Sequence, residues 1–174
     1  MNLVTAVIAL GANLDNPRKQ VEAALAALNQ VKGLRVKAIS PLYSTKPVGI
    51  TDQPDFVNTV VLVHTTKSAH ELLNTLLELE NKLGRIRDVP NGPRVIDLDL
   101  IDYNHQNIND ADLVLPHPRA CERAFVMVPL AAIAPYYVIG THDNASAVAA
   151  TLLKKEPDAV TIITDITDII DDQE

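Results

Sequence analysis

The sequence GPRVIDLDLI, residues 92–101, places two aspartates two positions apart in an otherwise apolar run. The alternation of apolar and polar residues predicts a β-strand over residues 94–103. Because successive side chains of a strand point to opposite faces, Asp97 and Asp99 are expected to leave the same face. Two carboxylates at this spacing repel each other, and a cation between them removes the repulsion. The pair therefore suits Mg²⁺, although a solvated strand face explains it equally well from the strand alone.

The length and composition restrict the domain organisation. A chain of 174 residues suits one domain, which we expect over residues 1–160, followed by a partly frayed acidic tail at residues 161–174. Hydrophobic residues make up 47% of the chain but aromatic residues only 3%, so the core must consist mainly of Leu, Val, Ile and Ala.

The charge and the single cysteine restrict the partners and the compartment. A net charge of −7 argues against binding to a nucleic-acid backbone. Cys121 is the single cysteine, which excludes an internal disulfide and favours a reducing, cytoplasmic location; such a residue is more often packed than reactive. The longest later apolar stretch is too short for a membrane span and contains Pro129 and Pro135. We expect no membrane or nucleic-acid partner.

Hydrophobic periodicity predicts alternating strands and helices. A helix is expected from Pro17 with Asn16 as its N-cap, and another over residues 68–84 with a Ser68–Glu71 capping box and Gly84 as its stop. The remaining predictions are strands over 3–11, 34–45, 55–66 and 94–103, and later helices near 119–132 and 145–155. The order β-α-β-β-α-β indicates an α+β, ferredoxin-like fold: an antiparallel sheet with helices packed on one face, plus C-terminal additions.

Positive charge gathers around the aspartate pair. Most arginines fall between residues 85 and 123: Arg85, Arg87, Arg94, Arg119 and Arg123. Arginine forks bind phosphate oxygens in pairs, so the cluster favours a phosphate–metal site, although each arginine alone suits the surface. The sequence contains neither a P-loop nor a G-x-G-x-x-G fingerprint, so the arginines and metals would have to hold a nucleotide.

At this point the motifs resemble a known family, the 6-hydroxymethyl-7,8-dihydropterin pyrophosphokinases of folate synthesis. The resemblance rests on GPRVIDLDLI followed by LPHPRACERAFVMVPL, with ALGANLDNP, YSTKPVGITDQPDFVN and LELENKLGRIR in order before them. It implies transfer of a pyrophosphoryl group from ATP to the pterin hydroxymethyl oxygen, with AMP as the second product and two Mg²⁺ ions. It covers roughly residues 4–140.

The resemblance also implies roles for individual residues. Asp97 and Asp99 would be catalytic magnesium ligands, and Arg85 and Arg94 catalytic phosphate-binding residues. Glu80, Arg87, His117 and Arg123 would bind ATP. The pterin would stack between Phe56 and Phe125, with Thr45, Pro47, Val48 and Asn58 around the ring. Taken alone, His117 is more often structural, each Phe more often core, and Glu80 a solvated helix residue.

Two other functions remain open at this stage. A different Mg²⁺-dependent phosphotransferase or phosphohydrolase would use the same aspartates without needing a pterin. A non-catalytic ferredoxin-like binding module would leave the combination of arginines, aspartates and histidine without a purpose. We expect a monomer whose partners are the two small-molecule substrates.

Overall fold

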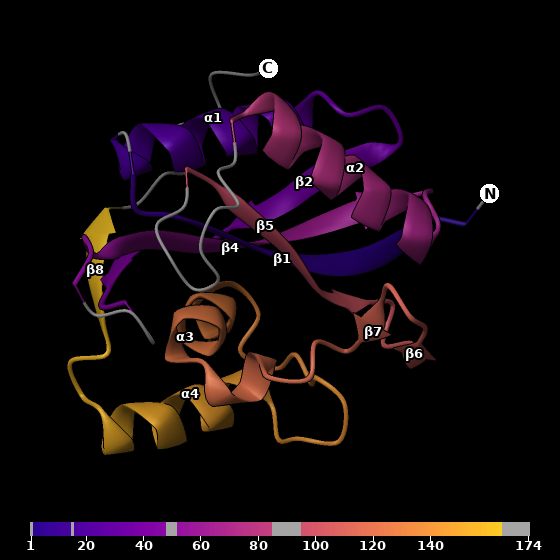
Figure 1. Ribbon diagram of the computed structural model, residues 1–174. Helices are drawn as coiled ribbons and strands as arrows, with labels where there is room; N and C mark the ends of the chain where they lie inside the picture. The colour runs from indigo at the N-terminus through magenta and orange to yellow at the C-terminus, as the bar shows by residue number, and fades with distance from the viewer. Residues whose placement is uncertain (1, 15, 48–51, 85–94, 165–174) are drawn as a thin grey trace.

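The computed structural model describes residues 2–14, 16–47, 52–84 and 95–164, and its core is one antiparallel sheet (Figure 1). Its strands are β1 (Val4–Ala12), β2 (Leu34–Ile39), β3 (Leu42–Thr45), β4 (Phe56–Thr65), β5 (Asp97–Tyr103) and β8 (Val160–Thr164). They lie in the order β5-β1-β4-β3-β8, and β2 also pairs with β4. A small second sheet pairs β6 (Ile108–Asn109) with β7 (Val114–Leu115).

The strand order confirms the ferredoxin-like fold, in which the first and third strands of the motif are central. The predicted strand over 34–45 is, however, two strands, because the chain breaks at Ser40 and Pro41. Proline offers no N–H to a ladder. The fully buried Ser40 continues the pairing instead, since its Oγ accepts from the backbone N–H of Val60 at 3.0 Å and its own N–H donates to Val60 O at 2.9 Å.

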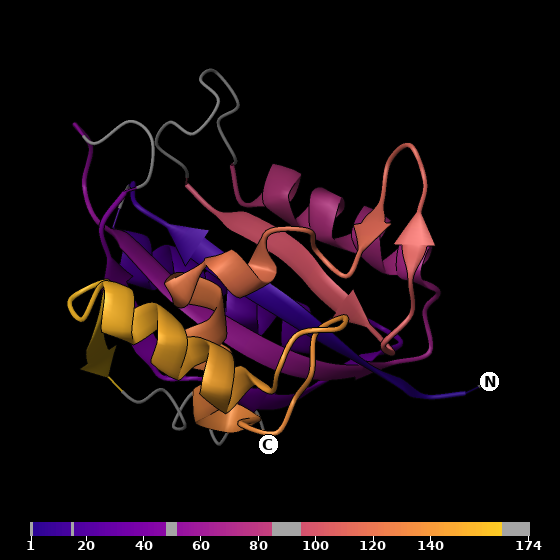
Figure 2. The same ribbon diagram turned by 90° about the horizontal axis from the view of Figure 1, so that it is seen from below.

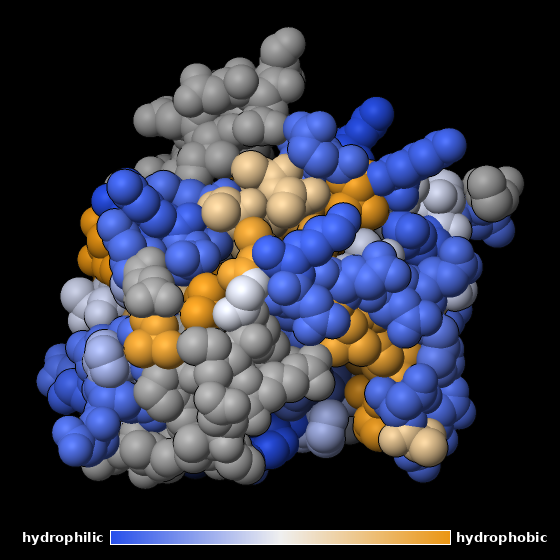
Figure 3. All heavy atoms as spheres, turned by 45° about the horizontal axis from the view of Figure 1, so that its top comes forward, coloured by the Kyte–Doolittle hydropathy of each residue, from blue (hydrophilic) through white to orange (hydrophobic). Residues whose placement is uncertain are grey.

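Helices cover both faces of the sheet, because the C-terminal additions pack on the face opposite the two helices of the ferredoxin-like motif. The helices α1 (Pro17–Asn29) and α2 (Ala69–Lys82) cover one face, and α3 (Ala124–Ile133) and α4 (Ala145–Lys155) the other (Figures 1 and 2). The physical reason lies in β1, which is apolar on both sides: Ile8 and Leu10 join the core beneath α1 and α2, and Val7 and Ala9 the core beneath α3 and α4. Hydrophilic residues predominate on the outer surface over α1 and α2 (Figure 3).

The helix ends follow their predicted signals in part. Ser68 and Glu71 form the capping box, and Gly84 has a positive φ of 85° directly after the C-cap residue of α2. Asn16 is the N-cap residue of α1, but it is left-handed and its side chain makes no capping bond. After Pro135 the described chain forms an isolated bridge between Val138 and Asn144.

The expected boundary at residue 160 falls within the sheet. β8 runs to Thr164 and pairs with β3, so residues 161–164 are part of the sheet and not of a tail. Residues 165–174 lie outside the described part of the chain. Among the residues described, no helix is both long enough and apolar enough to cross a bilayer.

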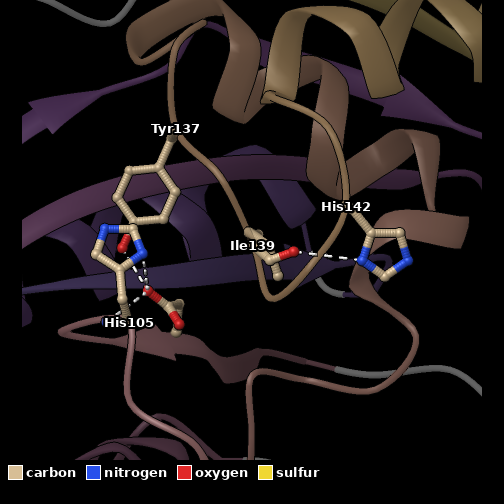
Figure 4. A network of polar contacts seen from close by, with 5 residues as sticks. His105, Tyr137, Ile139 and His142 are labelled. Atoms are coloured by element: carbon tan, nitrogen blue, oxygen red, sulfur yellow. Dashed lines mark hydrogen bonds and ion pairs between the residues drawn. The ribbon is translucent and has the colours of Figure 1, made fainter.

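A buried polar contact ties the α3–α4 connection to the end of β5 (Figure 4). Tyr137 Oη donates to Asp102 Oδ2 at 2.5 Å, and the His105 ring stacks on Tyr137 with centroids 4.6 Å apart. Asp102 is fully buried and lies opposite Val7 at a bulge in the β1–β5 register. Burial and the Asp102 charge raise the pKa of Tyr137 far above its usual value, so the phenol stays protonated as a donor.

Candidate active site

A cavity of about 1150 Å³ opens on the α3–α4 side of the sheet, where β1 and β3 end and β4 and β5 begin. Small residues form its floor: Ala9 and Gly11 of β1 lie opposite Asp99 and Asp97 of β5. Directly opposite residues of an antiparallel pair share a face. The small residues of the central strand therefore leave room in front of the carboxylates.

The aspartate pair is placed as the sequence predicts. Asp97 and Asp99 leave the same face of β5 and both line this cavity, each partly exposed. Leu98 between them points to the opposite face, into the core beneath α1 and α2. The period of two in the strand thus separates a face with two carboxylates from a packing face.

An amide and two aromatic rings form the opposite wall. Asn58 on β4 is buried, and its Nδ2 donates to Thr45 Oγ1 at 2.6 Å. Gly11 makes this possible, because a Cβ at that position would lie 2.5 Å from Asn58 Oδ1. Phe56 and Phe125 are both partly buried and both line the cavity. The wall offers apolar surface with one fixed polar edge, which suits a flat heterocycle.

Cationic side chains lie along the same cavity. Arg123, the N-cap residue of α3, lies over the Phe125 ring with its guanidinium carbon 5.5 Å from the centroid. Arg119 and Lys46 also line the cavity. Burial raises the pKa of the Cys121 thiol, which borders the cavity, so the protonated form is favoured and a nucleophilic role is not.

A smaller cavity of about 200 Å³ lies on the other side of Asp99. Half of its lining residues are leucines from α2, β5 and the segment before β7: Leu73, Leu77, Leu98, Leu100 and Leu113. Its polar lining includes Asp99, Glu80 and His117. Because Asp99 borders both cavities, an apolar pocket and a carboxylate pair lie next to each other.

Glu80 is buried, so the interpretation of this residue as solvated is wrong. Its side chain is 2% exposed, and its Oε2 accepts from the backbone N–H of Leu98 at 2.9 Å. β5 is the last strand on its side of the described sheet, so this N–H faces away from β1. Glu80 therefore anchors the free edge of the strand that carries both aspartates.

The environment of His117 keeps its imidazole neutral. Burial lowers the pKa of His117, and the charges of Arg123 and Arg119 lower it further. The backbone N–H of Arg119 donates to His117 Nδ1 at 3.2 Å, which leaves the proton of the neutral ring on Nε2. The backbone of His117 is fixed in turn, since its N–H donates to Ile101 O at 2.8 Å. These two contacts fix the ring so that its Nε2–H can donate to a ligand.

The structure brings most of the predicted site residues together. Around the larger cavity lie Thr45, Pro47, Phe56, Asn58, Asp97, Asp99, Arg123 and Phe125, and around the smaller one Glu80, Asp99 and His117. The predictions for Val48, Arg85, Arg87 and Arg94 fall outside the described residues.

Sequence reasoning missed two parts of the site. One is Gly11, whose place in ALGAN next to a polar turn was the available signal. The other is the far wall of the larger cavity, formed by α4 and by residues 156–159 before β8. No motif in residues 145–159 pointed to a site, because their position depends on long-range strand pairing.

Comparisons with known proteins agree with this geometry. The family model described as 7,8-dihydro-6-hydroxymethylpterin-pyrophosphokinase matches residues 7–135. A 2-amino-4-hydroxy-6-hydroxymethyldihydropteridine pyrophosphokinase of Bacillus subtilis is 43% identical over 128 residues, covering 74% of this chain and 77% of that protein. The protein of the same name from Methylorubrum extorquens is 42% identical over 147 residues, covering 84% of this chain and 93% of that protein.

Solved structures show the same fold at low sequence identity. A crystal structure of an HPPK-DHPS in complex with substrates has a TM-score of 0.71 and 14% identity, and the match covers 90% of this chain. The Plasmodium falciparum HPPK-DHPS with SDX-DHP has a TM-score of 0.69 and 14% identity over 92% of this chain. This chain spans 45% and 47% of the length of those two chains.

Proposed function

Because this chain belongs to the 7,8-dihydro-6-hydroxymethylpterin-pyrophosphokinase family, we propose that it transfers the pyrophosphoryl group of ATP to the hydroxymethyl oxygen of 6-hydroxymethyl-7,8-dihydropterin. The products are AMP and the pterin diphosphate, an intermediate of folate synthesis. One observation carries the proposal: the Asp97–Asp99 pair faces the same cavity as an amide and two phenylalanines. A group suited to binding phosphate through a metal and a wall suited to a heterocycle therefore line the same cavity.

The pterin is proposed to lie between Phe56 and Phe125. Ring stacking on both faces of a flat heterocycle leaves its edge for hydrogen bonds. The Asn58 amide is held by its hydrogen bond to Thr45 and by the close approach of Gly11. It is therefore oriented to form hydrogen bonds with that edge. Pro47 lies at the same wall, and Val48 is proposed to complete it.

The nucleotide is proposed to place its base in the leucine-lined cavity and its phosphates beside Asp99. An apolar slot of this kind suits a purine ring. His117 would donate from Nε2 to a phosphate oxygen, and Arg123 would neutralise phosphate charge from the α3 side. Arg85, Arg87 and Arg94 are proposed as further phosphate ligands. Glu80 borders this slot and acts chiefly by fixing β5.

Asp97 and Asp99 are the proposed ligands of two Mg²⁺ ions. The donor set fits, because carboxylate oxygens are the hard ligands that Mg²⁺ prefers, and the small side chains of Ala9 and Gly11 leave space beside them. When bound, Mg²⁺ neutralises phosphate charge and orients the attacking and leaving oxygens. Asp97 lies opposite Gly11, in the row that contains Asn58, and so is the carboxylate placed to accept a hydrogen bond from the pterin hydroxyl.

We further propose that the enzyme works as a monomer in the cytoplasm. The single cysteine supports a reducing compartment.

Exchange of a single carboxylate tests the proposal. We expect Asp97→Asn to lower kcat by a factor of about 1000 or more while the far-ultraviolet circular dichroism stays unchanged. The matched control is Glu78→Gln, which removes a carboxylate from the exposed side of α2 and should leave kcat within about two-fold. Unchanged turnover in Asp97→Asn would remove this residue from the chemistry. ADP or inorganic phosphate formed without pterin would instead favour another phosphotransferase or a phosphohydrolase.

A further inference from the structure

The C-terminal part of the chain contributes to the substrate cavity although the family match ends at residue 135. Ala147, Thr151 and Lys155 of α4 line the larger cavity, as do residues 156–159, which connect α4 to β8. From this connection the chain enters β8 beside β3, at the edge of the sheet (Figure 1). The far wall of the cavity and the last strand of the described sheet are thus consecutive in sequence.

Because β8 pairs with it, β3 is an interior strand of the sheet and not an edge strand. On one side, β3 pairs with β4 only through Tyr43, Ser44 and Thr45. On its other side, the same residues pair with β8, where Thr45 lies opposite Val160 and Tyr43 opposite Ile162. A four-residue strand paired on one side is poorly ordered, and pairing on both sides fixes its backbone.

The end of β3 is the part that reaches the substrate. Thr45 is 4% exposed and accepts the hydrogen bond that orients the Asn58 amide. Lys46 and Pro47, which follow directly, line the cavity. Any increase in the mobility of β3 would therefore change the position of the Asn58 amide and of the wall that the pterin is proposed to contact.

We infer that β8 is a positioning element for the pterin: by pairing with β3 it holds Thr45, Lys46 and Pro47 in place, and it closes the cavity with the turn at residues 156–159. This inference rests on the proposed function. The leucine-lined cavity does not depend on β8, because its lining comes from α2, β5 and residues 112–117. Loss of β8 should therefore weaken pterin binding and spare nucleotide binding.

Two truncations of the full chain separate the role of β8 from that of the residues after it. One variant ends at residue 164 and keeps β8; the other ends at residue 159 and lacks it. Nucleotide affinity is measured by calorimetry with Mg²⁺ and an ATP analogue that has a methylene bridge between the α- and β-phosphates. Pterin affinity is then measured by fluorescence in the presence of saturating analogue.

We expect the variant ending at 164 to match the full chain in both affinities. The variant ending at 159 should bind pterin more weakly by a factor on the order of ten, which corresponds to the loss of one or two net strand hydrogen bonds, with unchanged nucleotide affinity. Equal pterin affinity in both truncations would overturn the inference, as would an equal loss of pterin and nucleotide affinity. A full chain that binds the nucleotide but no pterin would refute the proposed function itself.

Two proline variants keep the test decisive if the shorter truncation does not fold. In a strand, neighbouring N–H groups point to opposite sides, so one of Thr161→Pro and Ile162→Pro removes a bond to β3 and the other affects only the outer edge. We expect one variant to lose pterin affinity on the order of ten-fold and the other to keep it. Two variants that both bind pterin like the full chain would overturn the inference.

Discussion

Replacing Glu80 tests whether a buried carboxylate fixes the strand that carries both aspartates. Glu80 lies in the last turn of α2, where the helix dipole disfavours a negative charge. Its position is explained by the 2.9 Å bond from the Leu98 N–H, on a side chain that is 2% exposed. Glu80→Ala removes a buried hydrogen bond and leaves the buried Leu98 N–H without that acceptor.

The size of the effect follows from the burial. A hydrogen bond contributes about 0.5–1.5 kcal/mol, and an unpaired buried donor costs about 1–3 kcal/mol, so Glu80→Ala should lower the free energy of unfolding by about 3 kcal/mol. Glu80→Gln keeps an acceptor oxygen within reach of Leu98 and should lower it by only about 1 kcal/mol. Glu78→Ala, on the exposed side of the same helix, should change it by less than about 0.5 kcal/mol.

Urea denaturation followed by circular dichroism measures all three variants, provided the dependence on urea concentration keeps the same slope. Steady-state kinetics should follow the same order, because Leu98 lies between Asp97 and Asp99: kcat falls in Glu80→Ala and largely recovers in Glu80→Gln. A Glu80→Ala protein as stable as Glu78→Ala would refute the reasoning. So would a Glu80→Gln protein as unstable as Glu80→Ala.

Three other predictions follow from single contacts. Gly11→Ala should raise the KM for pterin about ten-fold or more, because the new Cβ displaces the Asn58 amide; an unchanged KM in steady-state kinetics would contradict this. Tyr137→Phe should lower the free energy of unfolding by about 2 kcal/mol in urea, because the buried carboxylate of Asp102 loses its hydroxyl donor and keeps the backbone N–H of His105; a loss below about 0.5 kcal/mol would contradict it. For His117, NMR titration should give a pKa below the ordinary value of about 6.5 in the free protein and a higher one with the Mg²⁺–nucleotide analogue bound. The same depressed pKa means that stability should fall as the pH falls below about 6.5, where the unfolded chain takes up a proton and the folded chain does not; a free-protein pKa at or above that value would contradict both statements.

The aspartate pair could be predicted from sequence because its geometry is local. A period of two places Asp97 and Asp99 on one face whatever the strand pairs with, and the capping box at Ser68 is equally local. Glu80 shows where such reasoning ends. It lies four residues after Leu76 on the buried side of α2, but the Leu98 N–H that justifies its burial becomes available only once β5 is known to be an edge strand.

Other features depend on contacts that no short sequence pattern records. Tyr137 and Asp102 are 35 positions apart, and the apolar run around Tyr137 gives no sign that its hydroxyl meets a buried carboxylate. The pairing of β8 with β3 likewise joins segments more than a hundred residues apart. The single predicted strand over 34–45 failed for a local reason, since Pro41 was a visible break in the ladder.

Phosphorus NMR of the protein with ATP, Mg²⁺ and 6-hydroxymethyl-7,8-dihydropterin tests the central claim most directly. AMP and a pterin diphosphate should appear together, in equal amounts, and only when both Mg²⁺ and the pterin are present. ADP or inorganic phosphate as the product, or ATP that remains intact in the complete mixture, would contradict the assignment of the cavity as a pyrophosphoryl-transfer site.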